Sequence, residues 1–210
     1  MRCIIRTSEA AIAAHGSFSI AISGGSVVKC LGQLAHPDIA ARCDWSRWHV
    51  FWVDERAVPL THPDSNYLLA HTHWLSKVPI PSAHIHTLDD SLPVEAAAEA
   101  YEREMARCVE AGVLPMHPVE AAAAEAYDLE LRQCVEAGVL LTHPVLLSAA
   151  VVAVVAMGEG KRELLGRLFE AGGTGFAVGT GLPASMVLPR DGELIWMVDR
   201  EAAAGFLQDS

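Results

Sequence analysis

The stretch Trp48 to Tyr67, WHVFWVDERAVPLTHPDSNY, decides the fold of this chain. It opens on the β-forming run HVFWV, whose bulk falls on both faces, as in a strand covered on both sides. The charged run Asp54-Glu55-Arg56 follows at the carboxyl end of this strand, the edge where ligands bind in open α/β sheets. After a loop with two prolines, residues 64–67 (DSNY) predict a helix N-cap. The alternative is a solvated turn that ends in a cap, and the spacing alone favours neither.

A second stretch, which contains the preceding predicted strand, favours a ligand-binding edge over a solvated turn. Residues 18–23 (FSIAIS) predict another short strand, and Gly24-Gly25-Ser26 leads from it into an apolar-periodic segment at 27–34. A strand, a Gly-Gly turn and a helix start form a loop that can cradle phosphate, because its free N–H groups and the helix dipole favour an anion. Gly-Gly turns are common, so this motif by itself is a weak signal.

Taken together, the two stretches are specific enough to indicate one protein family. AIAISGGS, DWSRWHVFWVDERAVPLTHPDSNY, LSKVPIP and HIHTLDDSL closely resemble the 6-phosphogluconolactonases, in particular the plant-type members. VAVVAMGEGKRE and LPASMVLPRDGELIWMVDREAA fit as well, so the resemblance covers about residues 10–105 and 146–205. It implies an α/β domain with a doubly wound, mostly parallel sheet of the sugar-phosphate isomerase and lactonase type. We expect residues 1–210 to form this single domain.

Composition excludes several classes of partner. The net charge of −11 argues against nucleic acid and anionic membranes, since both need a basic face. The five cysteines show no CxxC pair and no disulfide-framework spacing, which indicates a reducing compartment. The N-terminus lacks the pattern of a secretory signal, and the longest apolar run, residues 145–157, is too short for a membrane span. We therefore expect a cytoplasmic protein without a membrane partner.

An internal duplication occupies residues 94–144. VEAAAEAYEREMARCVEAGVL (94–114) and VEAAAAEAYDLELRQCVEAGVL (119–140) are both rich in helix-forming Ala and Glu, and in each copy a Gly stands where a helix would end. The family resemblance places only the first copy in the family plan. The second copy predicts an extra helix to which we assign no function.

One family segment is missing from the sequence. Family members continue with a strand and a loop of the form GMGxDGHxASLFP, whose His is the implied catalytic residue, and no such segment exists here. The second repeat stands where that loop should be. Either the gene has lost the segment or the gene model is wrong.

The chemistry that the resemblance implies fixes the candidate site residues. Lactone hydrolysis needs water at the ring carbonyl, a base for its proton and donors for the developing oxyanion. The implied carboxylates are Asp54 and Glu55, with His62 as the nearest His that could substitute for the missing one. No metal and no cofactor are required. The implied groups for the phosphorylated sugar are Gly24, Gly25, Ser26, Arg56, Asn66 and Lys161.

Other conspicuous residues have structural interpretations. The tryptophans near the central stretch predict core packing. His84 and His86 alternate, so both can face one side of an extended segment. The sequence shows no third metal ligand at a spacing typical of a metal site, and we therefore expect both residues to have packing roles. Residues 7–15 predict a first helix capped by Thr7 or Ser8.

Three functions follow from the sequence. The first is hydrolysis of 6-phospho-D-glucono-1,5-lactone to 6-phosphogluconate in the oxidative pentose phosphate pathway. The second is a non-catalytic relative that binds a sugar phosphate or a partner protein, supported by the missing His loop. The third is a related sugar-phosphate isomerase or deaminase, against which the DER, DSNY and LPASMVLP segments argue.

Overall fold

The computed structural model describes residues 2–114, 139–141, 151–169 and 193–204. The chain divides into two compact units, Met1–Val145 and Leu146–Ser210, and each is described by itself. The first unit contains, in chain order, α1 (Arg2–His15), β1 (Phe18–Ile22), α2 (Ser26–Leu31), η1 (Gly32–Ala35), α3 (Pro37–Ala40), η2 (Trp45–Arg47), β2 (Trp48–Trp52), β3 (Asp54–Arg56), α4 (Asn66–His73), η3 (Leu75–Lys77), η4 (Ser82–His84), α5 (Val94–Glu110) and β4 (Val139–Leu141), where η marks a short 3-10 helix.

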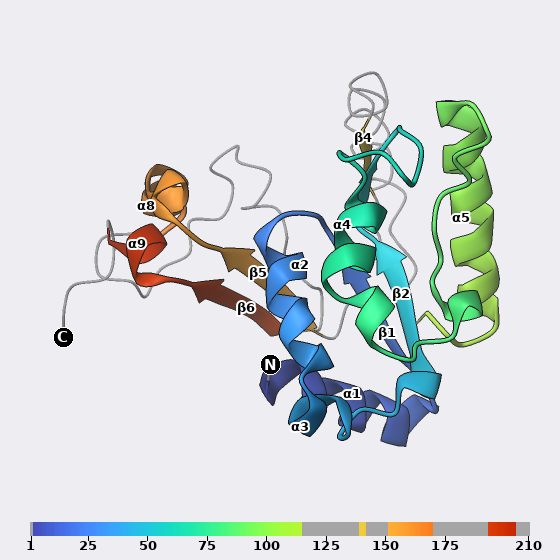
Figure 1. Cartoon of the computed structure of the whole chain (residues 1–210), viewed down its shortest axis with the longest axis horizontal. Coiled ribbons are helices and arrows are strands. Elements are labelled where there is room, and N and C mark those ends of the chain that lie inside the picture. The colour runs from blue at the N-terminus through green and yellow to red at the C-terminus, as the bar shows by residue number, and fades with distance from the viewer. Residues whose placement is uncertain (1, 115–138, 142–150, 170–192, 205–210) are drawn as a thin grey trace. The chain divides into compact units, whose positions relative to one another are not determined.

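The centre of the first unit is the parallel pair β1–β2, with Phe18 opposite Trp48 and Ile22 opposite Trp52. Because side chains alternate along a strand, the odd and even positions of β2 face opposite layers. Helices α2 and α4 cover one face and α5 covers the other (Figure 1). This confirms the prediction of a strand covered on both sides.

The face toward α2 and α4 holds the main core. Trp48 and Trp52 of β2 pack there with Trp74 and Trp45, and all four indole rings are almost completely buried. The rings of Trp45 and Trp48 lie 4.8 Å apart, and Trp48 meets Trp74 edge-on at 6.3 Å. The prediction that these tryptophans are packing residues is confirmed.

The opposite face carries a smaller core under α5. Phe51 of β2 packs there with Cys108 and Leu114. The hydroxyl oxygen of Tyr101, a buried residue of α5, accepts a 2.8 Å hydrogen bond from the backbone N–H of Trp52. This bond fixes α5 at the carboxyl end of β2, where the charged run begins.

Two local predictions need correction. Helix α1 begins at Arg2, because Ile5 continues the apolar stripe by one more turn and is buried against the core. Ser8 is therefore inside the helix, where its hydroxyl donates to the Ile5 carbonyl at 2.8 Å, and it is not a cap. The Asp54-Glu55-Arg56 run, which the sequence places beyond the end of a strand, is itself the short strand β3, which pairs antiparallel with β4.

Helix α4 and the first repeat follow the sequence prediction closely. Ser65 caps α4, since its Oγ accepts the N–H of Leu68 at 3.2 Å. Helix α5 covers the first copy of the duplication and is followed by Gly112 at φ +70°, a left-handed conformation that suits glycine. The second predicted helix lies outside the described residues, apart from residues 139 and 140, which belong to β4.

The second unit contains β5 (Val151–Ala156), η5 (Glu159–Lys161), α8 (Arg162–Leu168), β6 (Glu193–Val198) and α9 (Arg200–Ala203). Strands β5 and β6 are parallel, so their carboxyl ends adjoin. There Asp199 accepts the N–H of Gly158 at 2.9 Å and caps α9 through the N–H of Ala202 at 2.8 Å. Among the helices described in either unit, none combines the length and apolar content needed to span a bilayer.

Candidate active site

The carboxyl ends of β1 and β2 form the candidate site. The two strands are parallel, and the N–H of Val53 donates to the Ile22 carbonyl at 2.9 Å, which holds the two ends together. The Gly-Gly turn leaves the end of β1, and the charged run leaves the end of β2. The structure therefore brings together the two motifs that the sequence placed 30 residues apart.

Asp54 is the polar centre of this edge. Asn66, the first residue of α4, donates from Nδ2 to Asp54 Oδ2 at 3.1 Å and to the Asp54 carbonyl at 2.9 Å. The backbone N–H of Gly24 also stabilises the ionised form of the Asp54 carboxyl group and so counts against the rise of its pKa. A Cβ on residue 24 would lie 2.0 Å from Asn66 Oδ1, so glycine is required there for Asn66 to reach Asp54.

The surroundings of Asp54 tune its carboxyl group. Burial raises the pKa of Asp54 above its ordinary value, while the Asn66 hydrogen bond, the Arg56 charge and the Gly24 N–H partly offset that rise. A carboxylate with a raised pKa is a stronger base than one in water. Asp54 thus has the electrostatics expected of a group that handles a proton.

Glu55 has a different environment from its neighbour. Its side chain is 1% exposed, and both carboxylate oxygens are occupied. Oε1 accepts the backbone N–H groups of Arg56 at 2.8 Å and Asn66 at 2.7 Å, and Oε2 accepts those of Tyr67 at 2.8 Å and the Ser65 hydroxyl at 3.3 Å. The carboxylate therefore caps the N-terminus of α4, where free N–H groups and the helix dipole favour a negative charge.

The predicted anion-binding groups border Asp54. Gly25 precedes α2 at φ +82°, and no side chain caps the first turn of that helix. Arg56 is exposed, and among the described residues its guanidinium has no ion-pair partner. Ser26 begins α2 and is half-buried. Free backbone N–H groups and a cation suit the phosphate group of a ligand, and the nearby carboxylate suits a part of that ligand that carries no charge.

Two other predicted residues take no part in the hydrogen bonds that the described residues form around Asp54 and Glu55. His62 is exposed in the loop before α4, and its Nδ1 accepts the backbone N–H of Asp64 at 3.2 Å. Lys161 ends η5 in the second unit, where it follows Gly158 and the end of β5. Their roles toward a substrate remain predictions.

A shallow pocket lies beside this edge but does not include the Gly-Gly turn. Its volume is about 120 Å³, and it is lined by residues 55–60, which include Arg56, and by Leu88, Asp89, Asp90, Leu92, Val94, Ala97 and Ala98. Asp89 and Asp90 stand in its wall, and Asp90 accepts the N–H of Leu60 at 2.7 Å. The carboxylates of Asp89 and Asp90 disfavour an anionic ligand in the part of the pocket that they line, whereas Arg56 lines the part next to Asp54.

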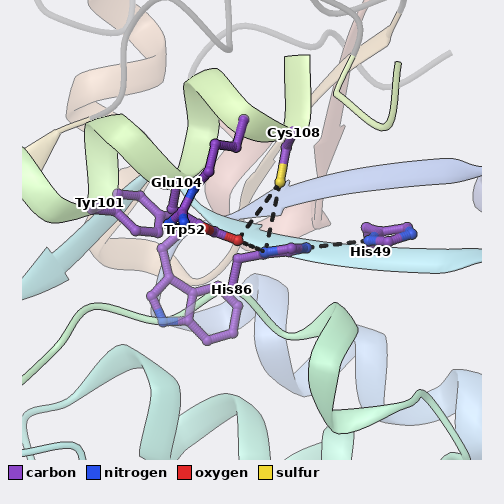
Figure 2. Close-up of polar contacts among 7 residues, drawn as sticks. His49, Trp52, His86, Tyr101, Glu104 and Cys108 are labelled. Atoms are coloured by element: carbon purple, nitrogen blue, oxygen red, sulfur yellow. Dashed lines mark hydrogen bonds and ion pairs between the residues drawn. The ribbon is translucent and has the colours of Figure 1, made fainter. Parts of the chain in front are cut away.

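A second polar cluster, which sequence reasoning missed, lies on the α5 face of β2. His86 Nδ1 donates to Glu104 Oε1 at 3.0 Å, and Cys108 Sγ lies 3.8 Å from each of these two atoms. His86 Nε2 is hydrogen-bonded to His49 Nδ1 at 3.2 Å (Figure 2). Both His84 and His86 stack on His49, which confirms that the alternating pair faces one side.

Burial controls the protonation of this cluster. It lowers the pKa of His49 to about 4, with His84 and His86 acting in the same direction. It also lowers the pKa of His86, which the Glu104 hydrogen bond partly restores. Burial and the Glu104 carboxylate raise the pKa of Cys108 to about 11. The available sequence signal was the i, i+4 pair Glu104 and Cys108, which places both groups on one face of α5.

Comparison with known proteins identifies the family. The sequence model of the family described as glucosamine-6-phosphate isomerases/6-phosphogluconolactonase matches residues 1–131. A rice (Oryza sativa subsp. indica) protein named probable 6-phosphogluconolactonase 3, chloroplastic, is 46% identical over 114 residues, which are 54% of this chain. That match spans only 35% of the relative's length.

Two further similarities extend over nearly the whole chain. The rice protein named probable 6-phosphogluconolactonase 2 is 32% identical over 96% of this chain and 82% of its own length. That alignment has 231 positions against a chain of 210 residues, so part of the relative has no counterpart here. The structure of 6-phosphogluconolactonase from Trypanosoma brucei matches with a TM-score of 0.73 at 20% identity, over 98% of this chain and 92% of that one.

These findings confirm the predicted α/β fold of the sugar-phosphate isomerase and lactonase type. The family model covers more than half of the chain, and the second rice relative aligns with both compact units. On this evidence, the chain belongs to the glucosamine-6-phosphate isomerase and 6-phosphogluconolactonase family.

Proposed function

We propose that this protein hydrolyses 6-phospho-D-glucono-1,5-lactone to 6-phosphogluconate, a step of the oxidative pentose phosphate pathway. The observation that carries the proposal is Asp54, a half-buried carboxylate with a raised pKa, held beside the Gly-Gly turn at the ends of two parallel strands. Relatives named as 6-phosphogluconolactonases support the same reaction.

In the proposed reaction, Asp54 accepts the proton of a water molecule as its oxygen attacks the lactone carbonyl. The bond between the carbonyl carbon and the ring oxygen then breaks, and the protonated Asp54 gives the proton to the ring oxygen, which becomes a hydroxyl. A general base of this kind typically contributes about 10²–10⁴-fold in rate. Asp54 would do this work without the family's His, and His62 is the side chain that could assist.

The 6-phosphate would bind at the start of α2. The N–H groups around Gly24, Gly25 and Ser26 and the Arg56 guanidinium supply the donors that such an anion needs. We include Asn66 as the group that orients Asp54, on the strength of its two bonds to that residue. Lys161 is retained as a candidate ligand from the second unit.

Glu55 has a positioning role in this proposal. The sequence predicts it as a catalytic carboxylate, but its two oxygens already accept four hydrogen bonds and its side chain is buried. We infer that Glu55 holds the start of α4, and with it Asn66, against Asp54.

The test of this function is the rate of hydrolysis of freshly made 6-phosphogluconolactone against a buffer blank. We expect a rate well above the spontaneous one. Arg56→Ala should raise KM about 10–100-fold, since a charge-assisted phosphate contact contributes about 1.5–3 kcal/mol. Hydrolysis of unphosphorylated gluconolactone should not change in this variant. Arg47→Ala, which removes an exposed arginine before β2, is the matched control.

The second candidate is a relative that binds the sugar phosphate without hydrolysing the lactone. It is favoured by the absence of the GMGxDGHxASLFP segment from the sequence. A folded protein whose rate equals the blank, but which binds 6-phosphogluconate and loses that binding in Arg56→Ala, would establish this candidate in place of the first.

We propose that residues 1–210 act as one domain, because the second rice relative aligns across both units. A single cooperative calorimetric transition is the expected signature. We also propose a cytoplasmic location. Some relatives are named chloroplastic and the second rice relative is not. The test is the location of a fluorescent fusion of this protein, and fluorescence in the chloroplast would contradict the proposal.

A further inference from the structure

We infer that His86, Glu104 and Cys108 form a binding site for a divalent transition-metal ion, best suited to Zn²⁺, on the α5 face of β2. Imidazole nitrogen, carboxylate oxygen and thiolate sulfur are the ligand types of zinc sites in proteins. The site is separate from the edge proposed to bind the lactone, and the inference does not depend on the proposed function.

The spacing of the three ligand atoms fits one ion. The atoms His86 Nδ1, Glu104 Oε1 and Cys108 Sγ are separated by 3.0, 3.8 and 3.8 Å. Tetrahedral zinc with ordinary bond lengths requires separations of about 3.3 Å between nitrogen and oxygen and about 3.6 Å to sulfur. The ligand atoms therefore need to move by only a few tenths of an ångström to coordinate a shared ion.

The three side chains come from rigid elements. Glu104 and Cys108 are one helical turn apart on α5, so the same helix face presents both. His86 is held by its backbone N–H, which donates to the Val50 carbonyl of β2 at 2.9 Å, and its ring lies parallel to Phe51 with centroids 4.3 Å apart. Because the site is largely formed before binding, little conformational entropy is lost when an ion enters.

The neighbouring groups support these ligands. In the metal-free protein His86 carries its proton on Nδ1, which donates to Glu104. When a metal binds, the His86 ring takes its other tautomer, with the proton on Nε2, and His49 Nδ1, 3.2 Å away, accepts the Nε2–H, so that His86 Nδ1 faces the ion (Figure 2). Arg107 binds the other oxygen of Glu104 at 2.6 Å, which keeps Oε1 turned toward His86 and Cys108. On binding, the thiol proton of Cys108 passes to solvent, and the thiolate and carboxylate together balance the charge of the ion.

The site has a buried side and an open side. The side chain of His86 is 8% exposed and Cys108 is 6% exposed, whereas the Glu104 side chain is 34% exposed. An ion can therefore enter past Glu104, and water can take the fourth position. Such an ion would tie α5 to the β2 side of the sheet.

The duplication supplies a matched control. The second copy repeats the pattern Tyr-x-x-Glu-x-x-x-Cys, with Cys134 at the position that corresponds to Cys108. In the described part of the chain, the Glu and Cys that lie beside His86 are those of the first copy, so one complete ligand set is expected there. Cys134→Ser therefore removes an equivalent thiol from the chain without removing a proposed ligand.

The experiment uses the full chain, stripped with a chelator and titrated with Zn²⁺ alone against a chromophoric competitor. We expect one ion per chain, and loss of affinity by at least about 100-fold in Cys108→Ser and 10–100-fold in His49→Phe. A hundredfold excess of free Zn²⁺ over Kd should raise Tm by roughly 5–10 °C. Cys134→Ser should match the wild type in all these measurements.

Cobalt provides a second readout that separates ligation from folding. The Co²⁺-loaded protein should show the absorption of a tetrahedral site with a thiolate-to-metal band, absent in Cys108→Ser and kept in Cys134→Ser. Glu104→Gln retains the shape of the side chain, so it is the variant least expected to disturb the fold, and it should also weaken metal binding. Binding that is not stoichiometric, or that depends on Cys134 instead of Cys108, would overturn the inference and leave a buried hydrogen-bond network.

Discussion

Asp54→Asn is expected to lower kcat/KM for 6-phosphogluconolactone by about 10²–10⁴-fold, the usual contribution of a positioned general base. The amide has the shape of the carboxylate and can still accept a hydrogen bond from Asn66, but it cannot take a proton from water. The measurement is the initial rate after subtraction of spontaneous hydrolysis.

Asp64→Asn is the matched control for this experiment. Asp64 lies in the loop between β3 and α4, but its side chain is exposed and its only ion-pair partner in the described part of the chain is His62. Its rate should equal that of the wild type. An Asp54→Asn enzyme that keeps the full rate would show that another group is the base.

The same variant should not lose stability at neutral pH. Burial raises the pKa of Asp54 above 3.8, so the protonated carboxyl favours folding and the ionised one opposes it. The stability from this group is fully present below pH 3.8 and is lost as the pH rises through the folded pKa. Asp54→Asn should therefore melt at least as high as the wild type at pH 7, with the difference vanishing below about pH 4.

Glu55→Gln is expected to reduce the free energy of unfolding by about 3 kcal/mol. The neutral amide cannot accept all four hydrogen bonds that the carboxylate receives, and its NH₂ group would face backbone N–H groups in a buried place. For a chain of this size, that loss lowers Tm by roughly 6–12 °C, measurable by circular dichroism.

Glu102→Gln, at an exposed position on α5, is the control and should change the free energy of unfolding by less than about 0.5 kcal/mol. Measured well below its Tm, Glu55→Gln should keep more lactonase activity than Asp54→Asn. If Glu55→Gln instead keeps the wild-type Tm and loses the activity, Glu55 contacts the substrate and its positioning role is wrong.

The chain's own sequence predicted the frame of this molecule well. HVFWV has bulk at every position, and the structure packs tryptophans on one face of β2 and Phe51 on the other. The Gly-Gly turn requires glycine for a local reason, since Gly25 has a left-handed backbone with φ +82°. These features are local, because strand alternation, turn conformation and helix capping depend on residues within a few positions of one another.

The tertiary structure decided which side chains of Asp54-Glu55-Arg56 are buried and which are accessible. The run is a strand because Val139–Leu141 pairs with it from more than eighty positions away in the sequence. Alternation then buries Glu55 under α4 and leaves Asp54 and Arg56 more accessible. Three adjacent charges look equivalent in sequence, and only the partner strand determines which of them faces inward.

The His86, Glu104 and Cys108 cluster was likewise out of reach of sequence reasoning. The sequence shows an HxH motif and, separately, a Glu and a Cys one helical turn apart on a predicted helix. Their meeting depends on α5 lying across β2, which the Tyr101 bond to Trp52 and the packing around Phe51 determine. The sequence by itself determined the strands, turns and lineage of this protein, because those follow from local conformational preference. The tertiary structure decided which side chains share a site, because that depends on the packing of segments distant in the chain.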